Sequence, residues 1–96
     1  MLLHAVLFEF KPEVSQERRA EVLALARRDL AAIPGVLDLT AGRAIRAGDE
    51  YPYAIAMRFR GREELEAYRA CPAHARFRDV EFFPLLARKT TLDYED

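Results

Sequence analysis

Four side chains that can take part in chemistry stand out in the sequence: His4, Tyr68, Cys71 and His74. Histidine has an ordinary pKa of about 6.5, so it can take up or release a proton at neutral pH without strong tuning by its surroundings. His74 is therefore the leading candidate for a general base, for example one that removes a proton from a carbon between two carbonyls. Tyr68 could donate its phenol hydrogen to the oxygen that becomes negative in such a reaction.

Each of these residues also has a purely structural explanation. His74 could bond to backbone groups in the first turn after Pro72, and Tyr68 could be a buried aromatic whose hydroxyl reaches a carbonyl. His4 lies between leucines, where a lone imidazole can simply be a satisfied core residue. Cys71 and His74 have a spacing compatible with metal binding, but zinc needs three or four protein ligands and the chain has only one further histidine. We predict no metal and no cofactor, and Cys71 has the simpler interpretation of a small buried thiol.

Composition places the chain among ordinary globular proteins. It has 96 residues, of which 51% are apolar, a formal net charge of −1 and a single cysteine. This length predicts one domain covering residues 1–96. The chain has no basic stripe of the kind that binds nucleic acid, so no nucleic-acid partner is expected. No apolar run is long enough to span a membrane, and the N-terminus lacks the features of a secretory signal, so a cytoplasmic protein is expected.

Hydrophobic periodicity predicts the elements that position the four side chains. They are a strand at residues 2–10, a helix from Ser15 to the Pro34-Gly35 break, and a hairpin of strands at 36–47 and about 53–59. A helix from Gly61 follows, is interrupted at Pro72 and resumes up to Pro84, before a last strand at 85–94. The order β-α-β-β-α-β predicts an α+β, ferredoxin-like domain with a four-stranded antiparallel sheet and helices on one of its faces.

The same periodicity predicts which side chains point inward. The expected inward residues are Val22, Leu23, Ala26, Leu30 and Ile33 of the first helix; Tyr53, Ile55, Met57 and Phe59; Leu65 and Tyr68; and Phe77 and Val80. In the strand at 36–47, one side should carry Leu37, Leu39, Ala41 and Ile45.

The first strand is apolar on both sides, which predicts self-association. His4, Val6 and Phe8 project to one side, whereas Leu3 and Leu7 project to the other. Helices cover only one face of such a sheet, and a face that met water should alternate to polar residues. We therefore expect a second copy of the chain, related by two-fold symmetry, to cover the second face.

Three segments resemble a known family. The opening HAVLFEFKPEVS, the joint IPGVLDL and the segment EAYRACPAHARF are similar in order and spacing to the stress-responsive A/B barrel domain, abbreviated Dabb. The proline-alanine-histidine-x-x-phenylalanine element is the most specific of them. The resemblance covers nearly the whole chain and implies a dimeric α+β barrel.

What the resemblance implies about function is more varied. Some plant members are heat-stable stress proteins, and one member, olivetolic acid cyclase, closes a linear polyketide into an aromatic ring. In that cyclase a histidine acts as general base and a tyrosine six residues earlier assists, and these positions match His74 and Tyr68. A histidine that lines the cyclase pocket matches His4, whereas Cys71 departs from the family pattern, which usually has a histidine there.

The leading expectation is a homodimer with an apolar pocket between sheet and helices that binds a small hydrophobic molecule. Its expected lining residues are His4, Val6, Phe8, Val22, Leu23, Ile55, Met57, Cys71 and Tyr94, with Tyr68 and His74 as catalytic candidates. One alternative is an enzyme, either a polyketide cyclase-like lyase or a cofactor-free monooxygenase, that uses His74 as base. Another is a heat-stable, stress-associated structural protein whose interior is tightly filled.

Overall fold

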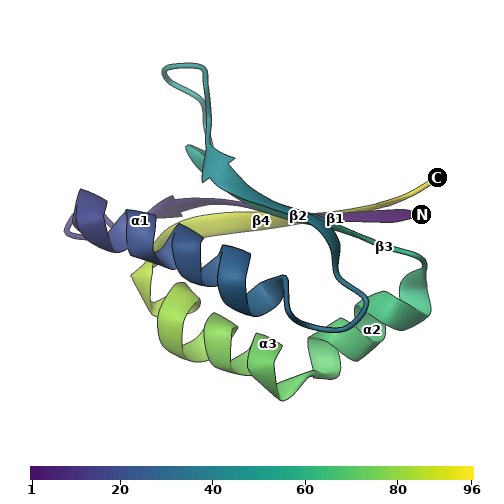
Figure 1. Cartoon of the computed structure of the whole chain (residues 1–96). Coiled ribbons are helices and arrows are strands. Elements are labelled where there is room, and N and C mark those ends of the chain that lie inside the picture. Colours follow the sequence, from purple (N-terminus) through teal and green to yellow (C-terminus); the bar gives the residue numbers. More distant parts are fainter.

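The computed structural model describes all 96 residues, which form a four-stranded antiparallel sheet with strand order β2-β3-β1-β4. All helices lie on one face of this sheet (Figure 1). The predicted ferredoxin-like α+β fold is confirmed. The elements are β1 (Leu2–Phe10), α1 (Gln16–Leu25) with a π-helical continuation (Ala26–Leu30), β2 (Leu37–Arg43), β3 (Tyr53–Phe59), α2 (Arg62–Ala70), α3 (Pro72–Arg76) with a π-helical continuation (Phe77–Phe82), a 3-10 turn (Phe83–Leu85) and β4 (Leu86–Glu95).

The central strand β1 determines which side chains meet the helices. It pairs antiparallel with β3 and β4, so that Val6 lies opposite both Ile55 and Thr91. Because side chains alternate along a strand, the even-numbered residues of β1 point to the helices and the odd-numbered ones point away. Phe8 and Phe10 are accordingly buried on the covered face, and their rings meet edge to face at a centroid distance of 5.3 Å.

The predicted inward positions of the first helix and of β3 are confirmed. Ser15 caps α1 by accepting a hydrogen bond from the Arg18 backbone N–H at 3.0 Å, as its position before the helix predicts. The inward residues of these two elements all belong to the buried core: Val22, Leu23, Ala26, Leu30, Ile33, Tyr53, Ile55, Met57 and Phe59.

The prediction that Leu37 and Ile45 share a side of β2 with Ala41 is wrong. Leu37 lies opposite Arg58 whereas Ala41 lies opposite Ile55, because a register shift between them turns the chain to the other face. Strand β2 ends at Arg43, and Ile45 is fully exposed in the loop of residues 44–52. The last hydrogen bond of this hairpin joins the Ala44 N–H to the Pro52 carbonyl. Pro52 has no N–H with which the ladder could continue, so the chain leaves the sheet at this point.

The prediction of an inward Val80 is also wrong, because the helix widens there. In an α-helix Val80, three residues after Phe77, would share its face. Residues 77–82 instead form a π-helical turn, whose hydrogen bonds span five residues. Phe82 therefore takes the inward position and stacks on Phe77 at a centroid distance of 5.3 Å, whereas Val80 is exposed.

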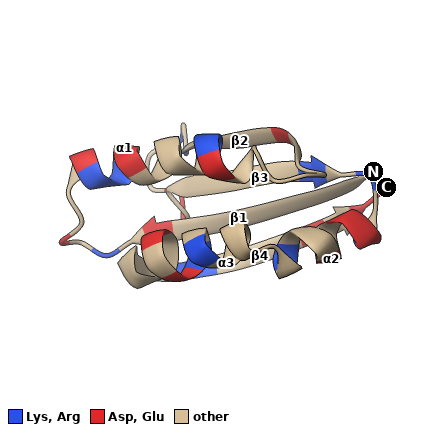
Figure 2. Cartoon of the chain, turned by 60° about the horizontal axis from the view of Figure 1, so that its bottom comes forward, with Lys and Arg blue, Asp and Glu red and all other residues tan.

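No helix covers the second face of the sheet, here called the open face (Figure 1). Charged residues gather on the helices and loops, and most of β1 and β3 carries none (Figure 2). The loop of residues 44–52, here called the arm, stands up from the sheet on the open side (Figure 1). The strand pairing places these residues on the open face: Leu3, Ala5, Leu7, Ala54, Ala56, Leu92 and Tyr94.

No helix is both long enough and apolar enough to cross a membrane.

Candidate functional site

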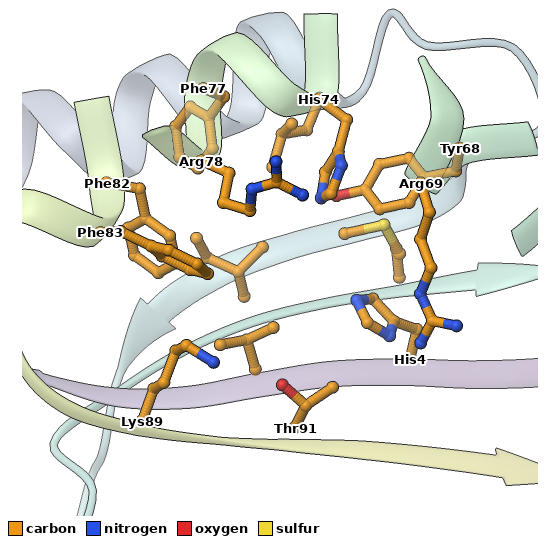
Figure 3. Close-up of a pocket in the computed structure, with 14 residues that line it drawn as sticks. His4, Tyr68, Arg69, His74, Phe77, Arg78, Phe82, Phe83, Lys89 and Thr91 are labelled. Carbon is orange, nitrogen blue, oxygen red and sulfur yellow. The ribbon is translucent and has the colours of Figure 1, made fainter. Parts of the chain in front are cut away.

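A cavity of about 250 Å³ lies between the covered face of the sheet and the helical segment that follows β3. Its floor consists of side chains from three neighbouring strands, and its wall comes mainly from α2, α3 and the turns after α3 (Figure 3). The floor residues are His4 and Val6 of β1, Ile55 and Met57 of β3, and Lys89 and Thr91 of β4. The wall residues are Leu30, Tyr68, Arg69, His74, Phe77, Arg78, Phe82 and Phe83.

A break between α2 and α3 brings Tyr68 and His74 together. Pro72 occupies the first turn of α3, and Cys71 before it has an extended backbone, which ends α2. The Cys71 carbonyl then accepts hydrogen bonds from the backbone N–H groups of His74 and Ala75, at 3.0 and 3.2 Å. Across this corner the rings of Tyr68 and His74 lie 4.3 Å apart between centroids.

His4 is held by a chain of polar contacts. Its Nδ1 lies 2.6 Å from Oδ1 of Asp93, whose Oδ2 accepts a hydrogen bond from Arg69 Nη2 at 3.0 Å. Arg69 Nη1 in turn donates to Glu66 at 3.1 Å. Because a carboxylate can only accept, this geometry favours the tautomer in which His4 Nδ1 carries the proton. The unprotonated Nε2 is then the nitrogen left to act as a base or acceptor.

His74 has a partly buried ring that is not fully satisfied. Its Nδ1 is buried and has no hydrogen-bond partner. Burial lowers the pKa of His74, and the positive charges of Arg78 and Arg69 act in the same direction, against the nearby Arg69 backbone, which raises it. The neutral imidazole is thus favoured at neutral pH, with a nitrogen able to accept a proton or hydrogen bond from a ligand.

Tyr68 is kept in its protonated form. Burial raises the pKa of the Tyr68 phenol well above its usual value, and neighbouring Cys71 adds to this effect. The ring packs against Phe59 and His4 at centroid distances of 5.2 and 6.0 Å. Such a phenol can donate a hydrogen bond to a developing negative charge. One end of the cavity thus combines two imidazoles with a hydrogen-bond donor, which is enough to move a proton to and from a bound molecule.

The structure brings six of the predicted site residues together and separates the others. His4, Val6, Ile55, Met57, Tyr68 and His74 all line the cavity. The prediction that Phe8, Val22 and Leu23 line the cavity is wrong. They lie between the sheet and the helices, as the cavity does, but there other core side chains pack directly against them. Cys71 is the helix-break residue and also does not line the cavity, and Tyr94 lies on the open face, where it is 62% exposed.

Sequence reasoning missed the contribution of β4. Its side chains Lys89, Thr91 and Asp93, here called the polar row, point to the covered face because they pair with Phe8, Val6 and His4. The sequence contains a signal for this, because polar residues occupy every second position of β4 although the strand beside it, β1, is apolar. Arg69, Arg78 and Phe83 were also missed, because no pattern in the sequence indicates that these helix and turn residues line a cavity. No cluster of three or more His, Cys, Asp or Glu side chains is arranged to hold a metal ion.

Comparison with known proteins identifies relatives along the whole chain. The family model described as "Stress responsive A/B Barrel Domain", Dabb, matches residues 2–96. No curated protein matches the sequence.

Solved structures with the same fold are similar over nearly their full length. A Dabb family protein from Mesorhizobium loti has a TM-score of 0.90 and 24% identity, covering 99% of this chain and 95% of the other. A dimeric ferredoxin-like protein of unknown function from Thermobifida fusca has a TM-score of 0.87 and 23% identity, covering 99% and 90%. A hydroxynitrile lyase from Passiflora edulis has a TM-score of 0.86 and 19% identity, covering 97% and 90%. At these identities the likeness shows the fold alone.

Proposed function

The chain belongs to the stress-responsive A/B barrel (Dabb) family, and we propose that it acts as a homodimer in which each subunit binds a small, largely apolar molecule. The cavity above β1 carries this proposal. Most of its lining residues are apolar, and the polar side chains of His4, Tyr68 and His74 gather at one end, which is a composition typical of a small-molecule site. A cavity of about 250 Å³ also argues against the alternative of a structural protein with a filled interior.

The two methionines allow a direct test of binding. Met57 lines the cavity and is 1% exposed, whereas Met1 is 47% exposed at the N-terminus. In protein labelled with ¹³C at the methionine methyl groups, addition of the neutral probe octanamide should shift the Met57 resonance in a saturable manner. The Met1 resonance should stay in place and thus serves as an internal control.

A cavity-filling substitution makes this test specific. Val6→Phe places a larger side chain in the cavity floor and should abolish the response of Met57 to octanamide. Val80→Phe makes the same change at an exposed position and should leave the response intact. Equal titration curves for the two variants would show that the probe binds elsewhere and would remove the basis of the proposal.

The open face supports the homodimer. Leu3, Leu7 and Leu92 remain only half-buried in the single chain and lie on adjacent strands of one surface. Apolar side chains in such a continuous patch favour association, and a two-fold pair covers the same patch on both copies. The relative from Thermobifida fusca is described as dimeric. Sheet-to-sheet contact through this face is the arrangement that we propose.

Acid–base catalysis in the cavity is the second candidate, in the manner of a polyketide cyclase-like lyase or cofactor-free monooxygenase. The observation that favours it is the His4–Asp93 contact of 2.6 Å, which fixes one imidazole beside a second imidazole with a lowered pKa. The hydroxynitrile lyase from Passiflora edulis has the same fold, which supports an enzyme as one use of this scaffold. His74 would act as base, and Tyr68 would stabilise the negative oxygen.

Proton abstraction can be measured without knowledge of the natural substrate. Ethyl 3-oxohexanoate carries an acidic C–H between two carbonyls, and its exchange with deuterium can be followed by NMR in D₂O. We expect the protein to accelerate the exchange and His74→Ala to reduce the acceleration by roughly 10²-fold. Val80→Ala is the control, and an acceleration that survives His74→Ala would dismiss His74 as the base.

A further inference from the structure

We propose that the molecule bound in this cavity carries an anionic group, and that Lys89, with Arg78 as a second positive charge, holds this group. The proposal rests on the binding function above and specifies its ligand class: a carboxylate or similar anion on an alkyl or aryl body. The apolar body would lie along Val6, Ile55 and Phe82, with its other end toward His4 and His74.

The charges around the cavity are all of one sign. Arg69, Arg78 and Lys89 line it, and no aspartate or glutamate does. Arg69 is already bound to Glu66 and Asp93, at 3.1 and 3.0 Å. This arginine therefore supports the His4 contact and is not available for a ligand.

Lys89 has no carboxylate partner. Its ammonium lies 4.8 Å from the centre of the Phe83 ring, and no ion pair or hydrogen bond involves its side chain. The pairing of β4 with β1 places it on the covered face beside Phe8, on the edge strand of the sheet, where its side chain is exposed at the rim of the cavity. Its aliphatic stem can follow the apolar wall while the charged end stays at the rim.

Arg78 supplies a second positive charge from the opposite wall. In Figure 3 Arg78 descends from the helical segment with its guanidinium toward His74, whereas Lys89 rises from the sheet below Phe83, away from the end with His4 and Tyr68. Arg78 pairs with Asp79, the next residue in the chain, and the side chain of Asp79 is 57% exposed. Such an exposed pair contributes little, so a carboxylate bound in the cavity can compete with Asp79 for the guanidinium.

The ligand class can be tested with a matched pair of probes. Octanoate and octanamide have the same chain length but differ in charge, and both can be titrated while the Met57 methyl resonance is observed. At neutral pH and low salt we expect octanoate to bind about tenfold more tightly or better, because a hydrogen bond to a charged group is stronger than a neutral one. High salt should reduce this preference, since exposed charges are screened.

The two lysines provide the variant and its control. Lys89→Met keeps the stem but removes the charge, and should reduce the preference for octanoate to about twofold or less. Lys11→Met makes the same change at the only other lysine, which is exposed outside the cavity, and should retain the preference. Arg78→Met should reduce the preference by a smaller factor because Asp79 already compensates part of the Arg78 charge.

Three outcomes would overturn the proposal. Equal affinity for octanoate and octanamide would show a cavity that binds apolar molecules without regard to charge, which leaves the proposed function standing. An equal loss of preference in Lys89→Met and Lys11→Met would indicate an effect of net charge alone. If neither probe shifts Met57, this inference and the binding function fail together.

Discussion

Neither face of the sheet carries only the side chains expected for a single chain in water. The covered face, which should be apolar throughout, contains His4 and the polar row of Lys89, Thr91 and Asp93. The open face, which should be polar, presents Leu3, Leu7 and Leu92 instead. Of these polar side chains only His4 is buried, and it is paired with Asp93, whereas Lys89 and Thr91 are exposed on the edge strand β4 at the rim of the cavity. Apolar side chains in water have a cost unless a partner covers them. The first face therefore supports the proposed site and the second the proposed interface.

Phe8 offers the largest test of this comparison. It is fully buried on the covered face, with Phe82 edge to face at 4.7 Å and Tyr53 stacked at 5.8 Å. Phe8→Ala should lower the free energy of unfolding by about 3–5 kcal/mol at any protein concentration, measured by urea denaturation. Leu7→Ala, one residue away but on the open face, should lower stability in a manner that depends on protein concentration. Concentration-independent losses in both variants would contradict the assignment of the two faces.

Leu7→Lys tests the open face directly. A lysine in the middle of an apolar contact would be buried without a partner, so self-association should weaken by about 100-fold or more. Sedimentation equilibrium measures this change, and the circular dichroism spectrum should remain that of the folded chain. Val80→Lys on the exposed helix surface is the control. A wild-type protein that sediments as a monomer at micromolar concentration would remove the proposed interface altogether.

Asp93→Asn tests the polar contacts of the covered face. The amide can no longer enforce the His4 tautomer, and we expect a stability loss of about 1–2 kcal/mol together with a change in the ¹⁵N resonances of the His4 ring. Asp79→Asn alters a carboxylate whose contact with Arg78 is exposed and should have little effect on either measurement. Unchanged His4 resonances in Asp93→Asn would show that the carboxylate does not orient the ring.

The smallest expected effect is a dependence of stability on pH. Because burial lowers the pKa of His74 below 6.5 in the folded protein, the unfolded chain takes up this proton first as the pH falls. The folded state thus loses stability as the pH drops below about 6.5 and keeps it above that value. Urea midpoints measured across this range should fall less steeply in His74→Gln than in the wild type. Identical pH profiles would show that the folded environment does not disfavour the charged ring.

The fold could be predicted from the sequence because its signals are local. Alternation in β1 and β3 identified the inward residues, and Pro34-Gly35 and Pro72 marked the helix ends. The errors arose where the local period changes. The π-helical turn puts Phe82 instead of Val80 on the inward side of the helix, and Pro52 ends the hairpin ladder before the chain reaches Ile45.

The candidate site was harder to predict because a cavity depends on how elements pack. Parity along β1 placed His4, Val6 and Phe8 on one face, yet only the helix positions decide that Phe8 is enclosed by core while His4 and Val6 remain open to the cavity. Lys89 and Asp93 are distant in sequence from His4 and Val6, and only the β1–β4 register brings them beside β1.

The arm of residues 44–52 has a consequence for the evolution of such proteins. It stands on the open side, and Ile45 on it is a large apolar residue with no cover from its own chain (Figure 1). None of the arm residues lines the cavity between the sheet and the helices. In the proposed homodimer, substitutions in this loop would therefore alter which closely related chain pairs with this one, while the lining of the proposed ligand cavity stays the same.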